Sequence, residues 1–142
     1  MIHYEADRGK WTFNKIPTIG NVCSLDLNWV TGHSQNLMKN IHMVVILQAT
    51  FLKGSPLRIC VPLTSYDPSK SLLDTHYVLK SVDYDFLEKD TIVKTEQLIT
   101  INWQDYLADQ NYLGSINKTD LMEIVKCAAN ALGIKEILIS RR

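Results

Sequence analysis

The stretch Arg58-Ile-Cys-Val-Pro-Leu-Thr-Ser-Tyr66 is an apolar segment that ends in two hydroxyl side chains and a phenol. Its side chains alternate as they do in a β-strand, which places Thr64 on one face with Arg58 and Cys60. The opposite face carries Leu57, Ile59, Val61 and Leu63. The polar loop at 67–71 leaves access for a ligand beside the strand end. A functional site is therefore one interpretation, and a strand end whose Ser and Thr cap backbone groups is the other.

Further strands are predicted on both sides of this segment. Period-two alternation or short apolar runs indicate strands at 22–29, 43–47, 57–63, 77–79 and 92–102, the last bent or divided near Gln97. The run at 43–47 is continuous, which is typical of a strand covered on both faces. No segment between these strands is long enough for a crossover helix, so we expect an antiparallel sheet.

One helix is predicted near the C-terminus. Asn117 or Thr119 is its N-cap, Asp120 and Glu123 favour its positive end, and Gly133 ends it. Its apolar stripe consists of Leu121, Ile124, Val125, Ala128 and Leu132.

The expected fold class follows from this order of elements. Residues 137–139 are expected to form a last short strand. The fold is then α+β, mostly antiparallel β, a small barrel closed by a C-terminal helix. A chain of 142 residues suits a single domain.

Composition excludes several function classes. Fifteen basic residues balance fifteen acidic ones, so no global positive field attracts nucleic acid or a membrane. No apolar run approaches the roughly 20 residues of a membrane helix, and the N-terminus lacks a signal peptide's apolar core, so we expect a cytoplasmic protein. We expect the three cysteines to be buried thiols. The spacing of the cysteines and of the four histidines does not fit a metal site, and we expect no cofactor.

Several motifs, taken in order, resemble the PemK/MazF family of bacterial toxins from about residue 20 to residue 133. They are Gly20-Asn-Val-Cys-Ser-Leu-Asp-Leu27, Thr31-Gly-His-Ser-Gln35, the strand at 58–65, Val93-Lys-Thr-Glu-Gln97 and Leu113-Gly-Ser-Ile116. The resemblance implies an SH3-like barrel that cleaves single-stranded RNA without a metal. It also implies a cognate antitoxin and a homodimer.

The resemblance also implies the site residues. The family carries an Arg-Pro pair before the second strand, with the Arg as a principal catalytic group, and this chain has neither residue there. Counting from Gly32 without a gap puts Lys39 at the position of the family's Arg, whereas aligning the apolar run that follows puts His42 there. We favour His42, because a match at Lys39 would force the polar His42 into the second strand. The implied catalytic residues are His42, Lys39, Thr64, Lys94 and Glu96, and the implied RNA-binding residues are His33, Gln35, Ser65, Gln97 and Arg58.

These residue types fit metal-free RNA cleavage. The reaction needs a base for the ribose 2′-hydroxyl, an acid for the 5′-oxygen, and donors for the developing phosphate charge. On a continuous strand Lys94 and Glu96 share a face and lie roughly 7 Å apart, close enough to act on two sides of one phosphate. Without the resemblance, such a pair is more often a solvated strand face with a weak ion pair.

Three functions remain open. The first is a toxin-like, metal-independent endoribonuclease of a toxin–antitoxin pair. The alternative is a catalytically silent barrel that binds a protein or nucleic acid, which the missing Arg-Pro pair and the neutral net charge favour. A gyrase-directed toxin of the related CcdB type is a third. In each case residues 1–142 form one domain, with 1–15 as an N-terminal extension and an unusually long connection at 103–112.

Overall fold

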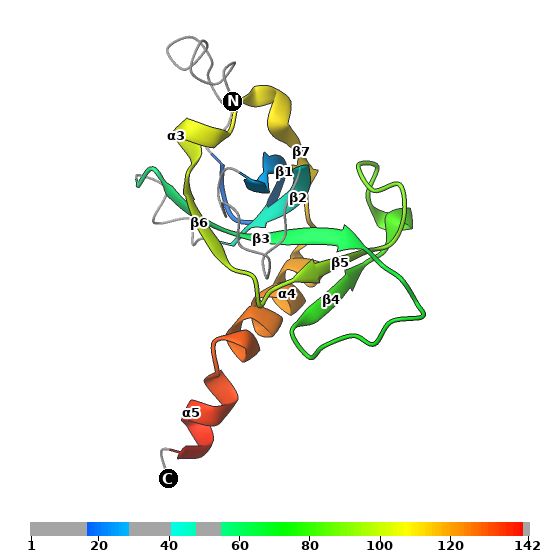
Figure 1. The fold of residues 1–142 in the computed structure, drawn as a ribbon, viewed down its shortest axis with the longest axis vertical. Helices are drawn as coiled ribbons and strands as arrows, with labels where there is room; N and C mark the ends of the chain where they lie inside the picture. Colours follow the sequence, from blue (N-terminus) through cyan, green and yellow to red (C-terminus); the bar gives the residue numbers. More distant parts are fainter. Residues whose placement is uncertain (1–16, 29–40, 48–54, 141–142) are drawn as a thin grey trace.

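The computed structural model describes residues 17–28, 41–47 and 55–140 (Figure 1). The described strands are β1 (Asn21–Asp26), β2 (Ile41–Ile46), β3 (Leu57–Ser65), β4 (His76–Leu79), β5 (Thr91–Lys94), β6 (Ile99–Asn102) and β7 (Tyr112–Ser115). The helical segments are η2 (Ser81–Asp83), α3 (Trp103–Tyr106), η3 (Asp109–Asn111), α4 (Lys118–Ala131) and α5 (Ile134–Ser140). The predicted extension at 1–15 and the end of the first predicted strand at Trp29 lie outside the described residues.

The strands form a mostly antiparallel sheet, as predicted, in the order β4-β5-β3-β2-β1-β7, with β6 pairing β3. The long segment at 92–102 is divided as expected, because β5 ends at Lys94 and the N–H of Gln97 donates to the carbonyl of Lys94 in a turn. Among the described strands no pairing joins β4 to β7, so the SH3-like closure stays a prediction.

Among the described residues, two apolar clusters form the core, one on each side of β2. Val45 packs into the first and Val44 and Ile46 into the second, and all three are fully buried. This confirms that the apolar run at 43–47 is covered on both faces. Cys23 and Cys60 belong to the second cluster, and burial raises the pKa of the Cys23 thiol to about 12, so this cysteine is a neutral apolar side chain.

The first half of β3 buries the face opposite to its aliphatic residues. Leu57 and Ile59 are exposed, whereas Arg58 is only 1% exposed. The guanidinium of Arg58 donates to the carbonyl oxygens of Pro17 (2.6 Å), Ser55 (2.5 Å) and Leu57 (2.7 Å). These bonds satisfy the buried cation and hold the chain before β1 against β3.

Helix α4 begins as the sequence predicts. The side chain of Asn117 accepts a hydrogen bond of 2.8 Å from the N–H of Asp120, and Asn117 is therefore the N-cap. Gly133, at a φ of 84°, follows the helix and ends it. Ile124 and Ala128 are buried, which confirms the predicted apolar stripe at its centre.

The prediction of a last strand at 137–139 is wrong, because these residues lie in helix α5. The N–H of Ile137 donates to the carbonyl of Gly133 at 3.0 Å. This segment extends away from the sheet (Figure 1), and no described strand pairs with it. Local helical hydrogen bonds therefore outweigh the β-propensity of its Ile residues.

Two phenols, one in β4 and one directly after η2, are hydrogen-bonded to helix α4. The hydroxyls of Tyr77 and Tyr84 each donate to the carboxylate of Asp120 at 2.5 Å. Burial, followed by the bond to Asp120, raises the pKa of Tyr77 to about 12 and also raises that of Tyr84. We call this pair of bonds from Tyr77 and Tyr84 to Asp120 the tyrosine clamp. It requires neutral phenols, since each phenol must donate a hydrogen to the carboxylate.

We expect Tyr77→Phe to lower the free energy of unfolding by about 1.5 kcal/mol, the loss typical of a hydrogen bond to a charged group. The folded pKa of Tyr77 exceeds the unfolded value of about 10, so its contribution is complete below about pH 10 and is lost as the pH rises to about 12. Urea unfolding between about pH 8 and pH 12 measures both effects. If Tyr77→Phe had the same free energy of unfolding as the wild type, and this free energy fell as steeply at alkaline pH, the tyrosine clamp would not contribute to stability.

No helix within the described part of the chain is long and apolar enough to cross a membrane.

Candidate functional site

A cavity of about 380 Å³ lies at the C-terminal end of β3. Of the predicted site residues that the structure describes, His42, Thr64 and Ser65 line it. The other polar lining residues are Ser24, Glu88, Lys89 and Thr91, and the apolar ones are Ile41, Met43, Leu63 and Phe86. The cavity thus combines an imidazole, several hydroxyls and both signs of charge beside an apolar surface.

The hydrogen bonding of His42 fixes its tautomer. Its Nδ1 lies 3.0 Å from the carbonyl oxygen of Leu63. A carbonyl oxygen only accepts, so Nδ1 carries a hydrogen and Nε2 is the acceptor nitrogen of the neutral ring. A half-buried imidazole held in this way is oriented to accept a proton at Nε2.

Thr64 and His42 come from the adjacent strands β3 and β2. Val44 of β2 and Pro62 of β3 are the last paired residues at this end, and His42 and Thr64 each lie two residues beyond them. On its other side Thr64 pairs with Ile92 of β5. Thr64 and His42 thus line the same cavity from two adjacent strands of the sheet.

Lys94 and Glu96 do not line this cavity. Lys94 ends β5, two residues after the partner of Thr64, so its side chain starts from the same face of the sheet as Thr64. Glu96 lies in the turn after β5, and the prediction that Lys94 and Glu96 share one face of a continuous strand is therefore wrong.

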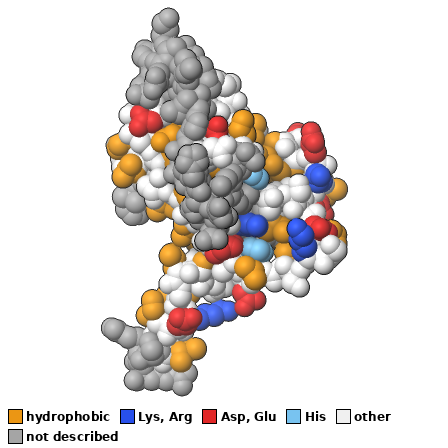
Figure 2. Space-filling model, in the orientation of Figure 1, with side chains coloured by type: hydrophobic (Ala, Val, Ile, Leu, Met, Phe, Trp, Pro, Cys, Tyr) orange, Lys and Arg blue, Asp and Glu red, His pale blue; other side chains and the backbone are white. Residues whose placement is uncertain are grey.

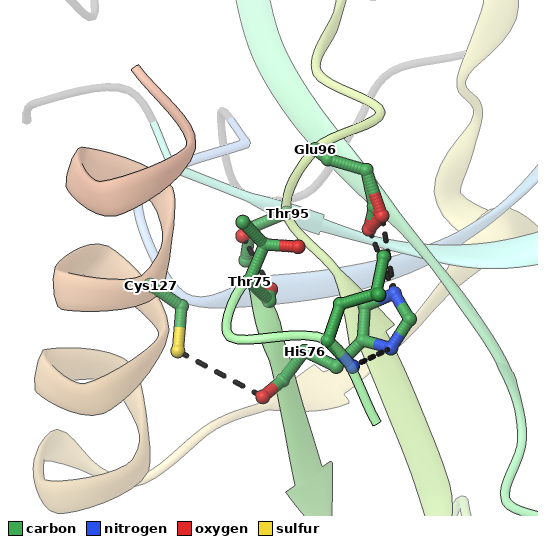
Figure 3. Close-up of polar contacts among 6 residues, drawn as sticks. Thr75, His76, Thr95, Glu96 and Cys127 are labelled. Carbon is green, nitrogen blue, oxygen red and sulfur yellow. Dashed lines mark hydrogen bonds and ion pairs between the residues drawn. The ribbon is translucent and has the colours of Figure 1, made fainter. Parts of the chain in front are cut away.

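Glu96 is instead paired with His76 (Figure 3). The Nε2 of His76 lies 2.9 Å from one carboxylate oxygen of Glu96 and 3.1 Å from the other. The Nδ1 of His76 accepts from the N–H of Leu73 at 3.2 Å, so Nε2 carries the hydrogen and donates to Glu96. This is the opposite tautomer to that of His42. The pair links the β4–β5 hairpin to the turn beyond it.

The remaining predicted residues are divided between three locations. Gln97 follows Glu96 in the turn and lies outside the cavity. Lys39, His33 and Gln35 lie outside the described residues. Arg58 is buried and bonded to backbone carbonyls, so its predicted contact with RNA does not fit its position in this structure.

Sequence reasoning missed Glu88, Lys89 and Phe86, which come from the segment before β5. No motif marks them. They reach the cavity because Thr91 pairs with Ser65, which places the segment before β5 beside the end of β3. On the face shown in Figure 2, basic side chains over the β3–β5 half lie among acidic ones instead of forming one basic patch. Attraction for an anion must therefore be local.

Comparisons with known proteins agree with this fold. Solved structures that resemble the chain include an endoribonuclease in complex with its cognate antitoxin from a mycobacterial species, at 19% identity and a TM-score of 0.62, over 83% of this chain and 96% of that one. MazF from Deinococcus radiodurans matches at 16% identity and a TM-score of 0.66, over 84% and 99% of the two chains. A MazE–MazF complex from the same organism matches at 15% identity and a TM-score of 0.59, over 84% and 98%.

A comparison with curated protein sequences finds no match. At these low identities the structural likeness shows the fold alone. A family model described as the PemK-like, MazF-like toxin of type II toxin–antitoxin systems, however, matches residues 19–132, which is most of the chain. The protein therefore belongs to the PemK-like, MazF-like toxin family of type II toxin–antitoxin systems.

Proposed function

We propose that this protein is an endoribonuclease that cleaves single-stranded RNA without a metal ion. The observation that carries the proposal is the arrangement of His42 and Thr64, which line one cavity with the acceptor nitrogen of the imidazole fixed by the bond from Nδ1 to Leu63. Family membership supports the same activity, since a structural neighbour is itself described as an endoribonuclease.

In the proposed reaction, Nε2 of His42 removes the proton from the ribose 2′-hydroxyl. The 2′-oxygen then attacks the adjacent phosphorus, and the bond from phosphorus to the 5′-oxygen breaks. The hydroxyls of Thr64 and Ser65 donate to the phosphate oxygens, where negative charge develops. The 5′-oxygen takes a proton from an acid, for which Lys94 is our candidate. The products are a 2′,3′-cyclic phosphate and a 5′-hydroxyl.

Lys94 starts from the face of the sheet that carries Thr64, whereas Glu96 and Gln97 have a flanking role in this proposal. They lie beyond the cavity, toward β4, where an RNA strand that leaves the cavity can meet them. We expect Lys94→Ala to reduce cleavage more than Glu96→Ala, because Glu96 is already paired with His76. Parallel cleavage assays of the two variants measure this order, and a greater loss with Glu96→Ala would contradict the assignment.

The test of the function is incubation of the purified protein, in the presence of a chelator, with an unstructured RNA and with a stable RNA hairpin. We expect cleavage of the unstructured RNA only. Thr64→Val keeps the shape of the side chain and removes its hydroxyl, so it should cleave about 10²-fold more slowly. Intact RNA combined with binding of a protein or nucleic acid would favour the catalytically silent alternative.

The proposed partners are RNA, a cognate antitoxin and a second copy of the chain. Membership of a toxin–antitoxin family supports the antitoxin. Growth arrest on expression that is relieved by co-expression of a small protein encoded next to this one is the expected result. Light scattering measures whether the chain is a homodimer.

A further inference from the structure

The segment before β5 places a lysine at the cavity. Lys89 lines it together with Ser65 and Thr91. The hydroxyl of Thr91 donates to the carbonyl of Lys89 at 2.8 Å, and the N–H of Tyr66 donates to the carbonyl of Asp90 at 3.0 Å. These bonds extend the β3–β5 pairing and fix the backbone of Lys89 beside the end of β3.

The charge of Lys89 is not neutralised by its neighbour in the sequence. The carboxylate of Asp90 accepts from the N–H and the hydroxyl of Ser81 and pairs with Lys80 at 3.7 Å. In the part of the chain that the structure describes, no carboxylate lies within ion-pairing distance of the Lys89 ammonium. The side chain is exposed, so its charge is accessible to an anion.

The rest of the lining suits a nucleotide. Phe86 packs against Tyr84, with ring centroids 5.3 Å apart, and against Gly114, where any side chain would meet its ring. This support fixes an aromatic side chain at the cavity, and aromatic side chains stack on bases. A volume of about 380 Å³ is within the range of small-ligand sites.

We propose that Lys89 is the cation that binds the RNA phosphate in this cavity. The inference rests on the proposed function and adds a residue to it. Glu88 shares the cavity and opposes the binding of an anion, so Lys89 and Glu88 together set the affinity for phosphate. Thr64 and Ser65 supply hydrogen bonds to the phosphate that Lys89 attracts.

The binding test uses the four ribonucleoside 3′-monophosphates and the corresponding nucleosides as probes, followed by NMR. We expect at least one nucleotide to bind more tightly than its nucleoside. Lys89→Gln should weaken its binding about tenfold or more, Lys89→Arg should restore it, and Glu88→Gln should strengthen it. Lys70→Gln, which removes an exposed lysine outside the cavity, is the matched control and should have no effect.

Cleavage of RNA by the same variants separates the two proposals. Loss of cleavage in Lys89→Gln with recovery in Lys89→Arg supports both. Nucleotide binding that depends on Lys89 in a protein that cleaves no RNA supports the phosphate site and refutes the proposed function. Cleavage at the wild-type rate in Lys89→Gln overturns the inference and leaves the function standing. Nucleotide binding that does not change in Lys89→Gln also overturns it.

Discussion

Replacing His42 with asparagine is expected to slow RNA cleavage by about 10²- to 10⁴-fold, the usual contribution of a general base. The amide nitrogen of asparagine can donate to the carbonyl of Leu63 in place of Nδ1. The substitution thus keeps the hydrogen bond of His42 and removes only the Nε2 acceptor. Single-turnover cleavage of an unstructured RNA measures the loss.

The matched control is His76→Asn. His76 is the second histidine whose tautomer is fixed by a hydrogen bond to the backbone. His76 lies outside the cavity and binds Glu96, so we expect a much smaller loss of cleavage. Thermal unfolding of both variants separates an effect on catalysis from an effect on folding. Equal losses in the two variants would contradict the role of His42.

Replacing Arg58 with alanine is expected to lower the free energy of unfolding by about 3 to 5 kcal/mol. The substitution removes the hydrogen bonds from the guanidinium to Pro17, Ser55 and Leu57. It also leaves a cavity at a side chain that is 1% exposed. Arg58→Lys should recover only part of the loss, because an ammonium cannot reproduce the planar fork.

Urea unfolding measures this loss, and Lys126→Ala is the control. Lys126 is exposed and pairs only weakly with Glu123, at 3.4 Å, so its removal should change stability by less than about 0.5 kcal/mol. If Arg58→Ala were as stable as the wild type but bound RNA more weakly, Arg58 would have the RNA-contacting role predicted from the sequence.

Much of the sheet could be predicted because its signals are local. The apolar run of β2 is long enough to show burial on both faces, and Asn117 has the cap chemistry that begins a helix. The family motifs imply that His42 and Thr64 share one site, and both line the cavity, although His42 lies within β2 and not before it as predicted.

The rest could not be predicted because it depends on contacts that are distant in the sequence. The alternation of β3 does not tell which face the core covers, and Arg58, for which the resemblance implies RNA binding, is buried. Glu96 has the right spacing for a strand face, but β5 ends two residues earlier. Lys89 reaches the cavity only through the pairing of β5 with β3. Helix α5 forms through local hydrogen bonds that outweigh its β-rich composition.

The central claim is that the cavity beside His42 and Thr64 cleaves RNA through the ribose 2′-hydroxyl. The most direct measurement is analysis of the ends produced when the protein acts on an unstructured RNA in the presence of a chelator, with a DNA of the same sequence alongside. We expect a 2′,3′-cyclic phosphate and a 5′-hydroxyl from the RNA, and intact DNA. Cleavage of both strands, or intact RNA, would contradict the claim.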